Sequence, residues 1–240
     1  MISIVTGTLD RKHLLGNLIK NTVESSDKLE LVLVDGGSTD GTQEYIKNLA
    51  HERIKLIEIG RRSPYPHYMN LGIKNATYDW ICQWNDDAIL VNKWNEVISE
   101  LDNNHDFYLF NWKYGAYEDI NNEDWIRGTD IITDDRGGWW LTDKYEVYGE
   151  IVMNYGVYNK KIFKEIGMYS NDFHYYYCDG DMSRRAYLFG YKHKSLYDIK
   201  VCSVYTPKKA HLVSGELEVY NRNHEEYKNK KLNNSIEFLK

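Results

Sequence analysis

Two adjacent aspartates, Asp86 and Asp87, follow the segment from Asp79 to Trp84, which has the composition of a buried strand. Neighbouring carboxylates at the end of a core strand repel each other and lose contact with water, so they need compensation. One explanation is a turn in which an aspartate caps the next helix. The other is a hard divalent cation such as Mg²⁺ or Mn²⁺, which prefers oxygen ligands and completes its shell with substrate phosphates. The second explanation predicts a diphosphate ligand.

Apolar segments alternate with helical patterns through the first 101 residues. Strands are expected at Ile2–Val5, Leu29–Val34, Ile54–Ile59 and Asp79–Trp84, each followed by a helix, around 14–23, 45–49, 68–76 and 94–101. This alternation predicts an α/β fold with a doubly wound, mostly parallel sheet, whose ligand crevice lies at the carboxyl ends of the strands. Thr6, Asp35 and the aspartate pair should face that crevice. Polar turns are expected at 6–8 and at 35–42, the latter with Ser38, Thr39 and Asp40 as helix N-cap candidates.

The pattern changes after residue 106. A strand is expected at Phe107–Trp112, followed by an irregular, acidic and aromatic stretch from Lys113 to Glu150 of the kind that is usually functional. Strand-like segments near 151–158 and 197–205, short helices at 159–167 and 180–190, and a helical tail from Gly215 complete the chain. Asp181 and Arg185 are spaced i and i+4, which favours a structural ion pair.

Composition excludes several classes of protein. The chain has 240 residues and a formal net charge of −6, which argues against a nucleic-acid partner. Its three cysteines lack C-x-x-C spacing, so we expect reduced, mostly buried thiols and no zinc site. Its apolar runs are strand-sized, and it begins without a signal-peptide pattern, so we expect a cytoplasmic protein, with peripheral attachment to a membrane left open. The segment D35-GGSTDGT-42 matches neither the dinucleotide fingerprint nor the P-loop.

Four stretches, taken together and in this order, resemble the successive motifs of family 2 glycosyltransferases of the GT-A fold. They are V5-TGTLDR-11, V32-LVDGGSTDGT-42, Y68-MNLGIKNATYDWI-81 with N85-DD-87, and C178-DGDMSRRAYLFGY-191. The resemblance implies a Rossmann-like, mostly parallel central sheet flanked by helices, with an acceptor-side C-terminal portion. It also implies a nucleotide-sugar donor, a Mg²⁺ or Mn²⁺ ion, and transfer with inversion at the anomeric carbon.

The resemblance also assigns roles on the donor side. Thr6, Thr8 and Asp35 would contact the base and ribose, and Asn70 would lie near the nucleotide. N85-DD-87 stands in the place of the family's D-x-D, so Asp87 is the expected metal ligand and Asp86 lies close to the ribose or the metal. The first position is Asn85, a departure that could weaken metal binding or change its geometry. His211 matches a histidine that lies near the diphosphate or metal in many relatives, although a lone histidine is more often structural or simply exposed.

The acceptor side is implied by the last motif, usually E-D-x-D-L-x-x-R. Here Cys178 replaces the glutamate, and Asp179 aligns with the general base. An inverting transfer needs one carboxylate that removes the proton of the acceptor hydroxyl. Four aromatic residues could stack on the acceptor or donor sugar or pack in the core: Trp125, Trp139, Trp140 and Tyr176.

The sequence therefore predicts a single domain, with a nucleotide-sugar-binding half at 1–105, an acceptor-binding and catalytic-base half at 106–212, and a helical tail at 213–240. The predicted activity is transfer of a sugar from a nucleotide-diphosphate donor to a hydroxyl of a glycan or another acceptor. A UDP-sugar is favoured, and GDP- and dTDP-sugars remain open. A catalytically impaired, sugar-nucleotide-binding homologue and a nucleotidyltransferase are the alternatives. The oligomeric state is not predicted.

Overall fold

A computed structural model of the protein describes residues 1–102, 104–114, 155–174, 178–203 and 222. Its strands are β1 Ile2–Thr8, β2 Leu29–Asp35, β3 Ile54–Glu58, β4 Trp80–Gln83, β5 Ala88–Leu90, β6 Phe107–Tyr114, β7 Gly156–Asn159 and β8 His193–Ser203. Its helices are α1 Lys12–Asn21, α2 Thr42–Leu49, α3 Tyr65–Asn75, α4 Trp94–Glu100, α6 Lys160–Ile166 and α7 Cys178–Leu188. The strands form one sheet in the order β3-β2-β1-β4-β7-β6-β8-β5.

The sheet has a parallel half and a mixed half. Strands β1 to β4 run parallel, and helices α1, α2 and α3 are the crossovers between them. Strand β7 then pairs antiparallel with both β4 and β6, while β6 pairs parallel with β8. The predicted α/β class with a mostly parallel central sheet flanked by helices is confirmed. One sheet contains strands from both predicted halves of the chain.

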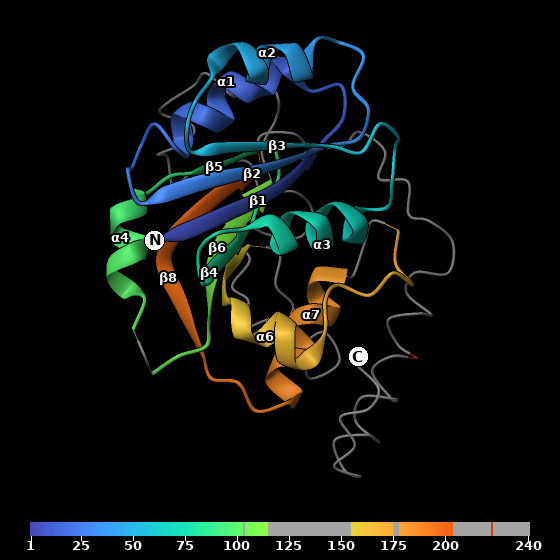
Figure 1. Ribbon diagram of the computed structural model, residues 1–240. Coiled ribbons are helices and arrows are strands. Elements are labelled where there is room, and N and C mark those ends of the chain that lie inside the picture. Colours follow the sequence, from blue (N-terminus) through green and yellow to red (C-terminus); the bar gives the residue numbers. More distant parts are fainter. Residues whose placement is uncertain (103, 115–154, 175–177, 204–221, 223–240) are drawn as a thin grey trace.

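Helices cover both faces of the sheet (Figure 1). Helices α1, α2 and α4 pack on one face, where side chains such as Leu15, Ile46 and Trp94 join the apolar core. Helices α3, α6 and α7 cover the other face with residues such as Met69 and Phe163. The central strands β1 and β2 are therefore buried on both sides, which explains why their sequences are mostly apolar instead of alternating, whereas the edge strand β3 is only partly buried.

Three local predictions differ from the structure. Strand β1 continues through Thr6 to Thr8, where a polar turn was expected, because its parallel partner β2 continues as far and Thr8 pairs with Asp35. Helix α2 begins after Gly41, in the left-handed region with φ of 85°, and not after one of the three predicted side-chain caps. Strand β5 was not predicted, because three residues are too few to show a period.

The three cysteines, Cys82, Cys178 and Cys202, are buried thiols, as predicted. Among the residues that the structure describes, no helix is long and apolar enough to cross a membrane. The stretch 115–150 and, apart from Arg222, the tail from residue 213 lie outside the described residues. The predictions made for these segments therefore remain predictions.

The predicted pair of Asp181 and Arg185 is confirmed as a buried structural interaction. The Nε of Arg185 lies 3.0 Å from Oδ2 of Asp181, and the two side chains are 2% and 0% exposed. The guanidinium also donates to the carbonyl oxygens of Ile166 at 3.1 Å and Met168 at 2.8 Å. Since these carbonyls lie at the end of α6 and just beyond it, Arg185 joins α7 to α6 and fixes the position of α7 on the sheet.

We expect Arg185→Leu to lower the free energy of unfolding by roughly 3–5 kcal/mol, because it leaves the Asp181 carboxylate and two carbonyls without a buried cation. Urea unfolding followed by circular dichroism measures the loss. A matched control is Lys47→Met, which removes an exposed pair with Glu58 and should change stability by less than about 1 kcal/mol. A loss as small in Arg185→Leu as in the control would contradict the structural role.

Candidate active site

The aspartate pair lies in a tight turn between β4 and β5. The amide of Ala88 donates to the carbonyl of Asn85 at 3.2 Å, so Asp86 and Asp87 are the two central residues of the turn. Trp84 fixes the turn to the core, because its side chain is fully buried and its indole N–H donates to the carbonyl of Ala88 at 3.3 Å. The carboxylates therefore stand at the carboxyl end of the parallel strands, where the ligand crevice was predicted.

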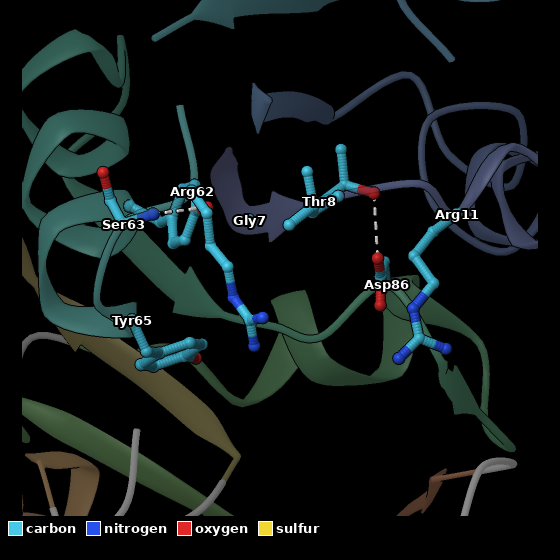
Figure 2. A pocket seen from close by; sticks show the side chains of 9 residues that line it. Gly7, Thr8, Arg11, Arg62, Ser63, Tyr65 and Asp86 are labelled. Carbon is cyan, nitrogen blue, oxygen red and sulfur yellow. Dashed lines mark hydrogen bonds between the residues drawn. The ribbon is translucent and has the colours of Figure 1, made fainter. Parts of the chain in front are cut away.

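Asp86 faces a cavity beside the end of β1 (Figure 2). The hydroxyl of Thr8 donates to Oδ2 of Asp86 at 2.9 Å. The cavity has a volume of about 230 Å³. Its lining consists of Gly7, Thr8, Leu9, Arg11, Arg62, Ser63, Tyr65, Tyr68 and Asp86. Ligand sites typically measure roughly 300–1,000 Å³, so this cavity accounts for part of a nucleotide-sized molecule.

Burial and mutual repulsion perturb both carboxyl groups of the pair. Burial raises the pKa of Asp86, while the nearby Arg11, the hydroxyl of Thr8 and His13 act in the opposite direction. For Asp87, burial and then the charge of Asp86 raise the pKa to about 7, again moderated by Arg11. Oδ1 of Asp87 is buried and has no hydrogen-bond partner within the described part of the chain. The turn thus holds negative charge that is only partly compensated.

A divalent cation fits this observation. It would supply the missing partner of the Asp87 oxygen and remove the repulsion between the two carboxylates, and both offer the oxygen ligands that Mg²⁺ and Mn²⁺ prefer. Among the described residues, no group of three or more His, Cys, Asp or Glu side chains is placed to hold a metal. His211, the other predicted metal ligand, lies outside the described residues.

Arg11 and Arg62 also line the cavity, and sequence reasoning did not single them out. Figure 2 shows the guanidinium of Arg11 beside Asp86 and that of Arg62 on the side of Tyr65. They come from different loops, β1–α1 and β3–α3. Arg11 ends the motif V5-TGTLDR-11, which could have pointed to it, whereas no sequence signal separated Arg62 from other arginines in loops. Together they supply positive charge for an anionic ligand at this cavity, although the formal net charge of the chain is −6.

The backbone before Arg11 is held in an unusual conformation. Asp10 has φ of 54°, a left-handed value that is strained for a residue with a side chain. Its amide donates to the hydroxyl of Ser38 at 2.9 Å, and its carboxylate accepts from the amide of Thr39 at 2.7 Å. These bonds between the β1–α1 and β2–α2 loops stabilise the conformation that directs Arg11 to the cavity.

Thr6 and Asp35, predicted to contact the base and ribose, lie outside the lining of this cavity. Thr6 is fully buried in β1. Oδ1 of Asp35 accepts from the amides of Gly37 and Ser38 at 3.0 Å each, and the carboxylate also accepts from the side chains of Ser38 and Gln43. Asp35 therefore organises the turn after β2, and its contact with a nucleotide stays a prediction.

Asn70 makes a paired contact with the backbone of Tyr169. Its Nδ2 donates to the Tyr169 carbonyl at 2.8 Å, and its Oδ1 accepts from the Tyr169 amide at 2.9 Å. The side chain thereby ties α3 to the segment that follows α6. Both ends of the amide are engaged in this contact, so the predicted proximity of Asn70 to the nucleotide stays a prediction.

Asp179, the predicted general base, lies in the first turn of α7. Burial raises its pKa to about 6, while a hydrogen bond from the amide of Gly180 at 2.9 Å acts in the opposite direction. Tyr65 lines the cavity, and burial, then the nearby Cys178 and Asp179, raise the pKa of its phenol. The aspartate pair and Asp179 therefore lie in the same region of the molecule, because Tyr65 lines the cavity with Asp86 and is also near Asp179. Trp125, Trp139, Trp140 and Tyr176, the predicted sugar-stacking residues, lie outside the described residues.

Comparison with known families matches residues 3–167 to glycosyl transferase family 2. The chain belongs to this family. The matched residues include the aspartate pair, Thr8 and both cavity arginines, whereas Asp179 lies beyond them. No curated protein matches the glycosyltransferase chain by sequence.

Solved structures of similar fold include the mannosyltransferase PcManGT from Pyrobaculum calidifontis in complex with GDP-Man and Mn²⁺. That match has a TM-score of 0.62 at 17% identity and covers 100% of this glycosyltransferase chain and 65% of the mannosyltransferase. TarS 1–349 from S. aureus in complex with UDP matches with a TM-score of 0.61 at 16% identity, over 97% of this chain and 72% of that one. The same TarS segment with UDP-GlcNAc has a TM-score of 0.60 at 18% identity, over 92% and 64% of the two chains. The predicted glycosyltransferase family and GT-A fold are confirmed.

We expect Asp87→Asn to stabilise the metal-free glycosyltransferase in neutral and alkaline solution. The pKa of Asp87 rises from an ordinary value of 3.8 to about 7 on folding. The folded state therefore holds a proton that the unfolded state releases, and stability falls as pH rises from about 4 to 7. In EDTA at pH 8, the substitution should raise the free energy of unfolding by roughly 1–3 kcal/mol, with little difference at pH 4.

Urea unfolding of both proteins at pH 4 and pH 8 measures this effect. The exposed Asp27→Asn is the matched control, since it also removes one carboxylate and should leave the pH dependence unchanged. Equal stability of Asp87→Asn and the parent protein at pH 8 in EDTA would show that burial and the charge of Asp86 do not destabilise the ionised Asp87 carboxylate.

Proposed function

We propose that the protein is an inverting glycosyltransferase that moves a sugar from a nucleotide-diphosphate donor to an acceptor hydroxyl, with Asp179 as the general base. One observation carries the proposal: Asp86 and Tyr65 line the same cavity in a chain of glycosyl transferase family 2. Asp87 is next to Asp86, and Asp179 is near enough to Tyr65 to contribute, after burial and Cys178, to raising the pKa of its phenol.

The cavity supports an anionic donor. Arg11 and Arg62 line it from two sides, and guanidinium groups bind phosphate oxygens with paired hydrogen bonds. Structural relatives were solved with GDP-Man and with UDP-GlcNAc, so both a purine and a pyrimidine base are compatible with this fold. A nucleoside diphosphate sugar is therefore the proposed donor class, with UDP, GDP and dTDP as the bases to test.

Asp87 and Asp86 would hold a Mg²⁺ or Mn²⁺ ion, with His211 as a further proposed ligand. A bound divalent cation in this position neutralises the charge that develops on a diphosphate leaving group. The chain's own contribution is the desolvated turn, which keeps Asp87 close to protonation at neutral pH without the ion. Metal affinity should therefore decrease as the pH falls below about 7, because protons and the cation compete for the same carboxylate.

Asp179 has the properties that a general base requires. Its pKa of about 6 leaves it ionised at neutral pH, yet basic enough to take a proton from a hydroxyl. In the proposed reaction the acceptor oxygen attacks the anomeric carbon while its proton passes to the Asp179 carboxylate. The bond from the anomeric carbon to the diphosphate oxygen breaks with its electron pair, so the diphosphate leaves from the opposite face and the configuration inverts.

A screen of nucleotide sugars tests the donor. We expect one of the UDP-, GDP- or dTDP-sugars, with Mn²⁺, to raise the melting temperature, because a ligand that binds only the folded state stabilises it by about 2.7 kcal/mol at 100 times its dissociation constant. EDTA should abolish the shift, and so should Asp87→Ala. The exposed Asp27→Ala is the matched control. Binding without turnover under any acceptor would favour the catalytically impaired homologue instead, and no shift with any donor would contradict the proposed function.

Replacing the base tests the mechanism. Asp179→Asn should lower kcat by on the order of 10²–10⁴-fold and leave the donor dissociation constant within a factor of about two. At saturating Mn²⁺ and donor, kcat of the parent enzyme should fall tenfold per pH unit below about pH 6, because only the ionised Asp179 accepts a proton. The exposed Asp198→Asn should keep the parent rate and profile. Parent-level turnover in Asp179→Asn would overturn the assignment of the base.

A further inference from the structure

Asn85, which stands where the family usually has the first aspartate of its D-x-D motif, has both ends of its side-chain amide in hydrogen bonds. Its Oδ1 accepts from the hydroxyl of Tyr65 at 3.3 Å, and its Nδ2 donates to the hydroxyl of Tyr155 at 3.0 Å. Tyr65 begins α3, and Tyr155 lies just before β7. One amide thus joins three segments that are far apart in the sequence.

The two tyrosines have different surroundings. Tyr155 is only 1% exposed, and its ring lies against that of Trp84 with 5.4 Å between centroids. Its carbonyl accepts from the amide of Phe110 at 3.1 Å, so its backbone is also fixed to the sheet. Tyr65 instead lines the cavity, where Figure 2 shows its ring across from Asp86. The amide of Asn85 therefore links a rigid residue to a residue of the cavity wall.

Tyr65 is also held from the side of Asp179. Its backbone amide donates to the carbonyl of His174 at 2.6 Å, a few residues before α7. Burial, with the nearby Cys178 and Asp179, raises the pKa of its phenol, so the hydroxyl stays protonated and can donate to Asn85. The ring consequently lies at the junction between the cavity and the carboxylate proposed as the base.

We propose that Asn85 is a positioning residue that orients Tyr65 toward the transferred sugar, and that it is not a third ligand of the metal. This inference rests on the proposed function. Turning the Asn85 side chain so that Oδ1 faces a cation would break the bond from Tyr65 to Oδ1 and the bond from Nδ2 to Tyr155, and a broken hydrogen bond inside the protein is costly. An aspartate here would add a third negative charge beside the adjacent carboxylates of Asp86 and Asp87, which lie in the same turn. Asparagine provides the bridge without that charge.

Metal affinity and turnover separate the two roles of Asn85. The variants are Asn85→Leu, which removes both hydrogen bonds at similar volume, and Tyr155→Phe, which removes one bond at a residue outside the cavity lining. The affinity for Mn²⁺ is measured by electron paramagnetic resonance in the presence of UDP and of GDP. Hydrolysis of the nucleotide sugar that most stabilises the parent protein gives kcat and KM.

We expect both variants to keep the Mn²⁺ dissociation constant within a factor of about two and to lose on the order of tenfold in kcat, because small displacements of a substrate-orienting group are costly. The double variant should lose no more than Asn85→Leu alone, since the two residues act through one contact. Tyr108→Phe is the matched control, because Tyr108 is a buried tyrosine whose hydroxyl is bonded to Asp102, away from the site. It should keep the parent kcat.

The possible outcomes are distinct. A loss of Mn²⁺ affinity in Asn85→Leu with an unchanged rate in Tyr155→Phe would identify Asn85 as a metal ligand and overturn the inference. Parent-level kcat in both variants would overturn it as well. Should Asn85→Leu fail to fold, Tyr155→Phe still decides, because it removes a single oxygen. A parent protein that binds neither UDP nor GDP with Mn²⁺ would overturn the proposed function, and this inference with it.

Discussion

The desolvated carboxylate pair in the β4–β5 turn is the constraint on which the rest of the site depends. A turn of this kind is stable only where its backbone is fixed and its charge is partly balanced, and the protein meets both conditions with nearby residues. Trp84 holds the turn on the core, the hydroxyl of Thr8 donates to Asp86, and Arg11 offsets the negative charge. The buried Oδ1 of Asp87 has no hydrogen-bond partner within the described residues, so it is suited to a cation and to an anionic molecule bound to that cation.

The loops at the same edge of the sheet are organised around that charge. The left-handed Asp10 and its hydrogen bonds to Ser38 and Thr39 tie two loops together and set the direction of Arg11. Asp35 uses its carboxylate on the amides and side chains of its own turn. Residues that resemble ligand contacts in the sequence therefore divide into two groups, those that line the cavity and those that shape the loops around it.

The region around Asp179, the proposed base, is built differently, from the mixed half of the sheet and the helices that cover it. The buried pair of Asp181 and Arg185 fixes α7 to the end of α6, and Asp179 is carried on the first turn of the helix fixed in this way. Burial then gives that carboxyl a pKa near 6. The hydrogen bonds of Asn85 to Tyr155 and Tyr65 join the mixed half of the sheet to the cavity wall. The orientation of Tyr65 therefore depends on the mixed half of the sheet as well as on the cavity.

The sequence by itself determined the order of strands and helices apart from β5, the parallel half of the sheet, the family, the buried pair on α7 and the location of the aspartate pair at a strand end. These features follow from apolar periodicity and from motifs in a fixed order, which are properties of neighbouring residues. The tertiary structure alone decided that Arg11, Arg62 and Tyr65 line the cavity with Asp86, that Asp35 and Asn70 make structural contacts, and that Asn85 bridges two tyrosines. The reason is that the side-chain hydrogen bonds of Asn70 and Asn85 join segments 20 to 99 residues apart and depend on the packing of whole elements, and a single side chain carries no local signal of its distant partner.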